Sequence, residues 1–175
     1  MIFETERLLL RPIEKSDAER LFLMDKNPMV MHYIGIPPLT DIQQTLDYID
    51  NIHEQYKKFG IGRYAVVDKA LNTVIGWSGL KMNTDTVNEH QNFYELGYRF
   101  MPEFWGKGYA TESSKPFLEH AFKTLKVESV AAYVHHENLA SQHVLEKLNF
   151  EKTNEFLETD GICYWYEILN KNYTL

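Results

Sequence analysis

The order of its expected strands and helices narrows the folds open to this chain more than any other feature. Strands are expected over 62–68, 74–82 and 92–100, and the residues 69–72 join the first two as a hairpin. After residue 100 a loop leads into two helices that alternate with strands. Hairpins followed by such β-α-β-α-β units predict an α/β fold, in which a mixed sheet carries helices on both faces.

Two helices are expected before these strands, because two segments carry the start signal of a helix. Ser16 and Glu19 have the spacing of a capping box, in which two side chains bond the first free amides of the helix. Thr40 and Gln43 repeat this spacing before a longer helix. That second helix is expected to end at Gly60, since glycine readily takes the left-handed conformation that closes a helix.

Two residues of the later helices make special demands on the backbone. Pro116 falls inside the first of them, where it removes one backbone hydrogen bond, so we expect a kink or a separate first turn. Asn149 follows the second, and asparagine is the non-glycine residue best suited to a left-handed cap. The other expected elements are a strand over 7–13, a helix to about residue 125, a strand over 129–134, a helix over 138–148, and strands over 150–157 and 163–169.

Length and composition favour one cytoplasmic domain, residues 1–175. Hydrophobic residues make up 44% of the chain and charged residues 25%, as in ordinary globular domains. No stretch approaches 18 consecutive apolar residues, so no membrane span is expected. The net charge of -7 disfavours a nucleic-acid partner, which would need a basic surface. Cys163 is the only cysteine, which excludes an intrachain disulfide and is consistent with a reducing cytoplasm.

Two glycines between the strand ending near residue 100 and the next helix indicate a phosphate site. Gly106 and Gly108 let the backbone curl so that successive N–H groups point at one centre, and the helix adds its unpaired amides and positive dipole end. The same glycines also fit a plain tight turn. Thr111 stands where the dinucleotide-binding fingerprint needs a third glycine. The candidate cradle comprises Trp105, Gly106, Lys107, Gly108, Tyr109, Ala110 and Thr111.

Several motifs around this cradle resemble those of the GNAT superfamily of N-acetyltransferases. The run Tyr94-Glu-Leu-Gly-Tyr-Arg-Phe-Met-Pro-Glu-Phe-Trp-Gly-Lys-Gly-Tyr-Ala-Thr-Glu112 resembles the acetyl-CoA motif of that superfamily. Asn138-Leu-Ala-Ser141, followed by Leu145-Glu-Lys-Leu-Asn-Phe150, is similar to motifs of the RimJ/RimL branch, which includes ribosomal-protein N-terminal acetyltransferases. Further fits in the segments 6–12 and 74–77 extend the resemblance over nearly the whole chain.

The resemblance implies a largely antiparallel sheet with splayed central strands and an acetyl-CoA site between them. The strand ending at Phe100 would diverge from the strand starting near Val130, and the pantetheine arm would enter the gap. Main-chain groups of Phe100 and Met101 would pair with pantetheine, and one N–H near Phe100 would stabilise the oxyanion of the reaction. The amides of 105–111 would hold the pyrophosphate. Asn138 would contact the cofactor arm or serve only as a helix N-cap.

The chain departs from the family at positions that matter for the chemistry. Leu145 stands where many relatives have a tyrosine acid, which leaves Ser141, or a water, as the proton donor for the departing thiolate. Trp105 replaces the usual Arg or Gln at the first cradle position and is expected to contribute its amide and its ring. A covalent route through Cys163 is disfavoured, because this residue falls on the last expected strand rather than beside the cradle.

The base that neutralises the acceptor amine is the least defined part of the site. Glu95 is the leading candidate, with Asp85, Glu89, Glu155 and Glu158 as loop alternatives and no metal expected. A peptide α-amine with a pKa near 8 is already about 10% neutral at pH 7, whereas a lysine or polyamine amine is only about 0.04% neutral. A weak base therefore favours an α-amine.

Three functions stay open at this point. The leading hypothesis is direct acetyl transfer from acetyl-CoA to the α-amine of a protein or peptide. The others are acetylation of a small amine (a polyamine, an amino-acid analogue or an antibiotic) and a module that binds acyl-CoA without turnover. A monomer and a homodimer both fit the sequence. Acceptor specificity is expected from the two early helices, the segment 29–39 and the loops near 84–90 and 159–162, although most of the segment 29–34 also fits core packing.

Overall fold

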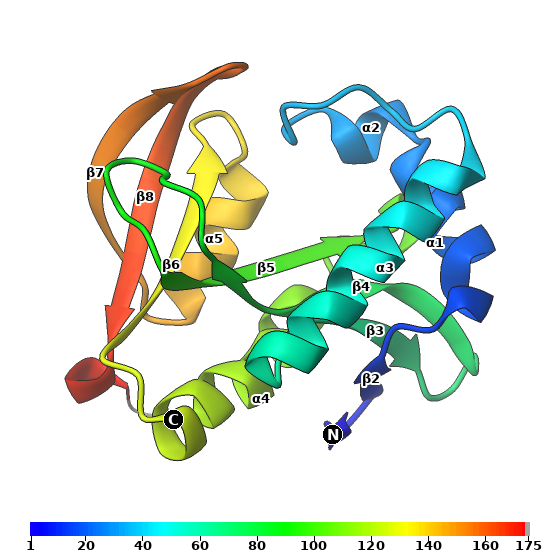
Figure 1. Cartoon of the computed structure of the whole chain (residues 1–175), viewed down its shortest axis with the longest axis horizontal. Coiled ribbons are helices and arrows are strands. Elements are labelled where there is room, and N and C mark those ends of the chain that lie inside the picture. The colour runs from blue at the N-terminus through cyan, green and yellow to red at the C-terminus, as the bar shows by residue number, and fades with distance from the viewer. Residues whose placement is uncertain (174–175) are drawn as a thin grey trace.

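One eight-stranded sheet organises the chain, which the computed structural model describes over residues 1–173 (Figure 1). The strand order is β1-β2-β3-β4-β5-β6-β8-β7, and every neighbouring pair is antiparallel except β5 and β6. The strands are β1 (Phe3–Glu4), β2 (Leu8–Pro12), β3 (Arg63–Asp68), β4 (Thr73–Asn83), β5 (Phe93–Phe100), β6 (Ser129–His135), β7 (Glu151–Glu158) and β8 (Gly161–Leu169). The predicted mixed, largely antiparallel sheet is confirmed.

Helices cover both faces of this sheet, as predicted. They are α1 (Ala18–Asp25), α2 (Pro28–Met31), α3 (Ile42–Phe59), α4 (Tyr109–Glu119) and α5 (Leu139–Lys147). On one face Arg99 of β5 binds Asp25 of α1. On the other, Phe100 of β5 stacks on Tyr109 of α4. None of the helices within residues 1–173 is both long enough and apolar enough to cross a membrane.

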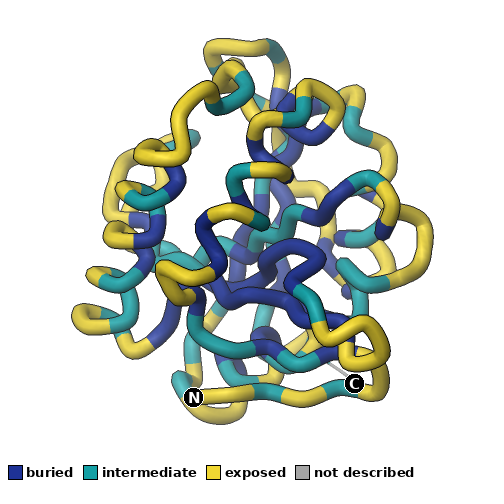
Figure 2. The backbone as a smooth tube through the Cα atoms, turned by 90° about the vertical axis from the view of Figure 1, so that its right-hand side faces the viewer, coloured by how far each residue is buried: buried dark blue, intermediate teal, exposed yellow. Residues whose placement is uncertain are grey.

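Burial is deepest in the central strands, because helices pack on both sides of them. All six residues of β3 are buried, and so are seven consecutive residues of β4. In contrast, most of β7 is exposed, since this strand forms one edge of the sheet. Figure 2 shows the buried backbone gathered in the interior, with exposed segments around it. The core therefore forms on the strands that carry the site described below.

Both early helices begin one or two residues away from the predicted start. Before α1, the carboxylate of Asp17 accepts from the N–H of Glu14 at 2.8 Å, so the Ser16–Glu19 box is wrong. Before α3, Asp41 rather than Thr40 is the N-cap, and its partner is the next glutamine along the chain. Before α3 the aspartate adjacent to the predicted cap takes the role, because its carboxylate is a stronger acceptor than a hydroxyl, whereas before α1 the N-cap of the box is Glu14 and Asp17 is its partner.

The helix ends follow the sequence more closely than the helix starts. Gly60 closes α3 in the left-handed conformation, with φ 70°. Asn149 is also left-handed after α5, with φ 64°, as predicted. Pro116 lies inside α4 without dividing it, so the expected separate first turn is wrong. The irregularity comes later, where His120–Leu125 forms a π-helical segment that Lys126 ends with φ 53°.

The cap at Asn149 gives a test of this backbone geometry. Asn149→Ala should lower the free energy of unfolding by about 1 kcal/mol, because alanine pays the steric cost of the left-handed region. Asn149→Gly should leave stability unchanged or slightly higher, since glycine pays no such cost. Urea unfolding of the three proteins measures this. An alanine variant as stable as the wild type would contradict the assigned cap.

Candidate active site

The gap between β5 and β6 is the central feature of the candidate site. These parallel strands share a single registered pair, Glu95 with Ala131, and then diverge (Figure 1). The β4 ladder places Gly76 opposite Phe100, and the N–H of Met101 donates to Ile75. Because N–H directions alternate along a strand, the N–H of Phe100 then faces the gap. The predicted splay of the central strands is confirmed.

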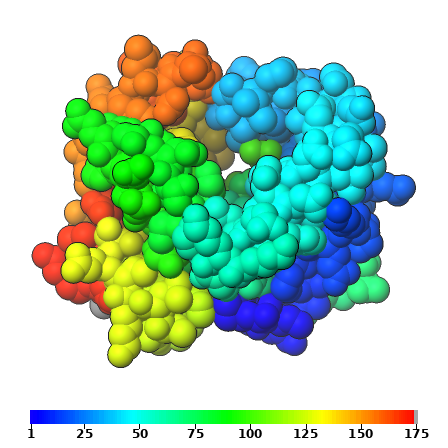
Figure 3. Space-filling view, in the orientation of Figure 1, coloured from blue at the N-terminus to red at the C-terminus, as the bar shows by residue number. Residues whose placement is uncertain are grey.

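Two connected cavities open from this gap. One, of about 560 Å³, is lined on the side of α5 by Tyr98, Ser141 and Leu145. The other, of about 700 Å³, lies beside α3. Six residues line both cavities: Ile36, Arg63, Trp77, Glu95, Arg99 and Tyr133. Figure 3 shows the molecule hollowed at this place, between the segment that follows α2, helix α3 and the turn from β7 to β8.

The cradle has the backbone geometry of an anion site. Gly106 and Gly108 are both left-handed, with φ 71° and 80°. Glu112 is the first residue of α4 whose N–H bonds back along the helix, to the carbonyl of Gly108. Within residues 1–173, the six N–H groups from 106 to 111 donate no recorded hydrogen bond. They therefore remain open to an anionic ligand, as expected at a helix start.

Two predicted main-chain contacts of the site are wrong, because other groups already occupy those amides. The N–H of Trp105 donates to the carbonyl of Pro102 at 3.1 Å, so Trp105 cannot contribute its amide to the cradle. Its ring N–H instead donates to the carbonyl of Phe100 at 2.7 Å. The N–H of Met101 donates to Ile75 at 3.1 Å, which leaves Phe100 as the predicted residue that faces the gap.

Residues far away in sequence hold the cradle in place. The hydroxyl of Tyr109 donates to Asp68 at 2.7 Å, and this bond lowers the pKa of the Asp68 carboxyl. The guanidinium of Arg7 lies over the Tyr109 ring at 4.4 Å and pairs with Glu112 at 2.6 Å. The start of α4 is thus fixed to β3 and to the residue that precedes β2. Of the other predicted cradle residues, Lys107 lies in the turn between the two glycines, and Ala110 and Thr111 lie in the first turn of α4.

Ser141 and Asn138 lie together at the start of α5. The side chain of Asn138 accepts from the N–H of Ser141 at 3.1 Å, which confirms the N-cap reading. Tyr98 of β5 approaches from across the gap, with its hydroxyl 3.0 Å from Ser141 Oγ and 3.1 Å from the Ser141 carbonyl. Sequence reasoning missed Tyr98, although alternation along β5 from the buried Leu96 places it on the same face.

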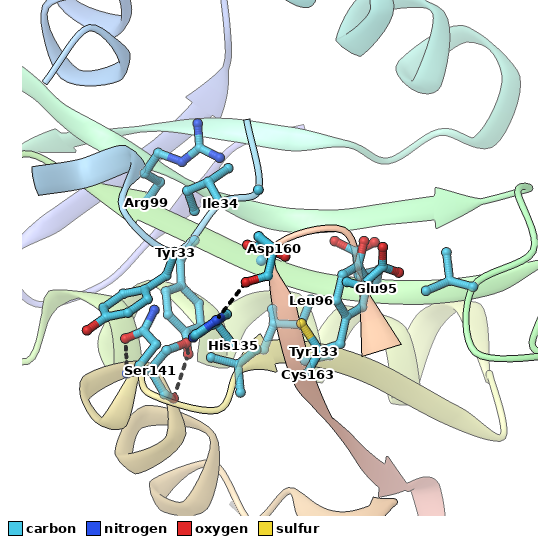
Figure 4. Close-up of a pocket in the computed structure, with 18 of the residues that line it drawn as sticks. Tyr33, Ile34, Glu95, Leu96, Arg99, Tyr133, His135, Ser141, Asp160 and Cys163 are labelled. Carbon is cyan, nitrogen blue, oxygen red and sulfur yellow. Dashed lines mark hydrogen bonds between the residues drawn. The ribbon is translucent and has the colours of Figure 1, made fainter. Parts of the chain in front are cut away.

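Glu95 faces the cavities, but its carboxylate is already engaged. One oxygen pairs with the guanidinium of Arg63, and the other accepts from the side-chain amide of Asn83 at 3.1 Å. The Arg63 side chain is only 7% exposed. Gly97 makes room for it, since a Cβ there would lie 2.7 Å from Arg63 Nη2. Figure 4 shows Glu95 and Ser141 on opposite sides of the pocket.

Other predicted residues divide between the cavity walls and the rest of the molecule. Asp85 and Glu158 line the cavities, whereas Glu89 and Glu155 do not. Cys163 also lines the gap, and burial raises the pKa of its thiol to about 11, which keeps it protonated and poorly nucleophilic at neutral pH. From the segment 29–39, residues 31, 33–36 and 39 form part of the walls, and Val30 and Met31 belong to the core.

The two histidines that end β6 differ in their surroundings. His135 is only 9% exposed and stacks on Tyr33 at 5.3 Å between ring centres. Its Nε2 lies 3.3 Å from the carbonyl of Asp160 (Figure 4). His136 is more exposed. Within residues 1–173 no cluster of His, Cys, Asp or Glu side chains could hold a metal ion.

Comparison with known proteins agrees with this geometry. The family model "Acetyltransferase (GNAT) domain" matches residues 7–151. An uncharacterised N-acetyltransferase of Bacillus licheniformis, p20, is 32% identical over 148 residues, which cover 85% of this chain and 81% of p20. Spermidine N(1)-acetyltransferase of Escherichia coli (strain K12) is 26% identical over 149 residues, 85% of this chain and 75% of that protein.

Solved structures show the same fold. A GNAT-family acetyltransferase from Bacillus anthracis superposes with a TM-score of 0.80 at 27% identity, covering 98% of this chain and 99% of that one. The ribosomal-protein-S5-alanine acetyltransferase of Vibrio fischeri has a TM-score of 0.74 at 20% identity, with full coverage of both chains. Together the fold, the cradle and these matches define the class of the protein as an N-acetyltransferase. The chain belongs to the GNAT acetyltransferase family.

A substitution at Gly108 tests whether the cradle binds a ligand or only turns the chain. Gly108→Val should raise the Kd for acetyl-CoA about tenfold or more, because valine is strained at φ 80° and displaces the amides. Gly60→Val is the matched control: it introduces the same strain at φ 70°, where α3 ends. Calorimetric titration of both variants measures the affinity. Equal Kd values for Gly108→Val and the wild type would show that the cradle is only a turn.

Proposed function

We propose that this N-acetyltransferase transfers the acetyl group of acetyl-CoA to the α-amine of a protein or peptide, as a RimJ/RimL-like member of its family. The open amides of 106–111 fit a pyrophosphate, and the edge of β5 that faces the gap fits a pantetheine arm, with the N–H of Phe100 open and its carbonyl already accepting from the ring N–H of Trp105. Asn138 lines the same cavity, so its side-chain N–H₂ is available beside the cap. Bound acetyl-CoA would supply an activated acetyl thioester.

The residues around the gap divide the work of the transfer. The N–H of Phe100 stabilises the charge that develops on the thioester oxygen. Ser141, on the α5 side of the gap, is the donor to the departing sulfur. Glu95, on the opposite face of β5, is the base for the amine and acts directly or through a water. The acceptor enters through the cavity beside α3, because that cavity is lined by Glu95 but not by Tyr98 or Ser141.

One observation favours an α-amine acceptor: both carboxylate oxygens of Glu95 already have partners. A carboxylate whose two oxygens already accept from Arg63 and Asn83 has fewer lone pairs left with which to accept from an ammonium group. An α-amine needs this help least, because about 10% of it is neutral at pH 7. The name of the Vibrio fischeri fold neighbour, an S5-alanine acetyltransferase, is consistent with such an acceptor.

A polyamine is the second candidate acceptor. Asp85, Glu158 and Asp160 line the cavities, and none of them has a recorded ion pair within the described residues. Such carboxylates attract a chain that carries several positive charges. The relative named spermidine N(1)-acetyltransferase fits this alternative. The non-catalytic module remains the third reading, because Leu145 replaces the tyrosine acid of many relatives.

An amine panel assayed at pH 7 separates these candidates. We expect turnover with a peptide bearing a free N-terminus and none with the same peptide blocked at that end. With spermidine, turnover at pH 7 should be lower by about a hundredfold, because its amines are almost fully protonated. Release of coenzyme A thiol gives the rate. Faster turnover of spermidine than of any peptide would favour the polyamine, and acetyl-CoA binding without turnover would favour the module.

Ser141→Ala tests the role of the seryl hydroxyl. We expect kcat to fall about tenfold while the Kd for acetyl-CoA changes less than twofold, because the hydroxyl acts on the departing sulfur rather than on the bound ground state. Steady-state kinetics and calorimetry measure the two quantities. A variant with the kcat of the wild type would assign the thiolate to water instead.

A further inference from the structure

The wall of the gap contains a tyrosine that the family pattern does not explain. Leu145, at the position where many relatives have a tyrosine acid, is apolar and only 1% exposed. Tyr98 lines the same cavity from β5, on the opposite side of the gap from α5. Its hydroxyl meets both the Oγ and the carbonyl of Ser141. The contact joins residues 43 positions apart, so it forms only in the folded chain.

Two features fix the geometry of this contact. Asn138 caps α5 by accepting from the N–H of Ser141, and this bond fixes the backbone position of Ser141. Tyr98 alternates with Gly97 and Arg99 along β5, so it lies on the face opposite Glu95 and the amine. The seryl hydroxyl is therefore held between a fixed helix start and a buried phenol. It lies on the side of the gap where the sulfur is expected.

The chemistry of Tyr98 suits a hydrogen-bond donor rather than a proton source. Burial raises the pKa of its phenol, so the hydroxyl keeps its proton at neutral pH. An ordinary phenol, with a pKa of about 10, already holds its proton more firmly than a thiol of about 8.5. Full proton transfer from Tyr98 to a thiolate is therefore unfavourable. A hydrogen bond from Tyr98 to Ser141, which in turn donates to the sulfur, requires no such proton transfer.

We propose that Tyr98 is the positioning residue for Ser141, an inference that rests on the proposed function. The single proton of the phenol is shared in a three-centre hydrogen bond between the Ser141 carbonyl and Ser141 Oγ, which leaves the seryl O–H free to donate to the sulfur of coenzyme A. As the C–N bond forms and the C–S bond breaks, the bonding pair goes to sulfur and is stabilised there as thiolate. The proton lost by the amine leaves through water, and Tyr98 keeps its own.

The thiol of bound coenzyme A reports on this arrangement without turnover. Ultraviolet absorbance of the thiolate, followed against pH in the binary complex, gives the pKa of the bound thiol. In the wild type this pKa should lie below that of free coenzyme A, because donors stabilise the thiolate. In Tyr98→Phe and in Ser141→Ala it should return toward the free value.

Kinetics of the same variants complete the test. Tyr98→Phe should lower kcat about tenfold and change the KM for acetyl-CoA less than twofold, and the double variant should be no slower than Ser141→Ala alone, since both act through one hydroxyl. The matched control is Tyr94→Phe, on the same strand and face, whose hydroxyl makes no recorded hydrogen bond within residues 1–173. It should retain the kcat and the thiol pKa of the wild type.

The outcomes distinguish this inference from the function on which it rests. Wild-type turnover with unchanged kcat and thiol pKa in Tyr98→Phe would overturn only the role of Tyr98, as would losses that multiply in the double variant. Absence of coenzyme A binding by the wild type would overturn the proposed function and this inference together. If Tyr98→Phe did not fold, a bound-thiol pKa in Ser141→Ala equal to that in the wild type would still overturn the role of Tyr98.

Discussion

The hydrogen-bond ladder between β5 and β6 stops after one pair, and the site depends on that interruption. A continuous ladder would use the β5 edge at Phe100 and close the space between the strands. The parallel arrangement requires a long crossover, which here contains the cradle and α4. The same topological step therefore opens the gap and places a helix start at its end. One free strand edge and one set of open amides follow from a single connection.

Buried ion pairs occupy the floor of the open gap. Arg63 pairs with Glu95 and Arg99 pairs with Asp25. Both guanidinium groups lie 5.2 Å from the centre of the Trp77 ring. Removing one partner of such a pair leaves an uncompensated buried charge, which is strongly destabilising. The pairs therefore constrain the geometry of the acceptor side. They also explain why Glu95, although well placed, has no free oxygen.

Local signals in the sequence predicted most elements to within a few residues, but strand β1 and helix α2 were not expected. Gly60 and Asn149 ended their helices as expected, because a left-handed cap depends on one residue and its immediate neighbours. Helix starts were displaced where an aspartate stood next to the predicted cap, as at Asp41. Pro116 does not divide α4, so a separate first turn is wrong, and the alternative of a kink at this residue stays a prediction.

The sequence by itself determined the family and the cradle, since glycine spacing and ordered motifs are local properties of the chain. Only the tertiary structure decided which groups of the site are free. The amides of Trp105 and Met101 are used within the protein, and both oxygens of Glu95 are taken. The contact between Tyr98 and Ser141 across the gap was likewise decided by the tertiary structure. Hydrogen bonds between distant residues depend on how strands and helices pack, which no local pattern encodes.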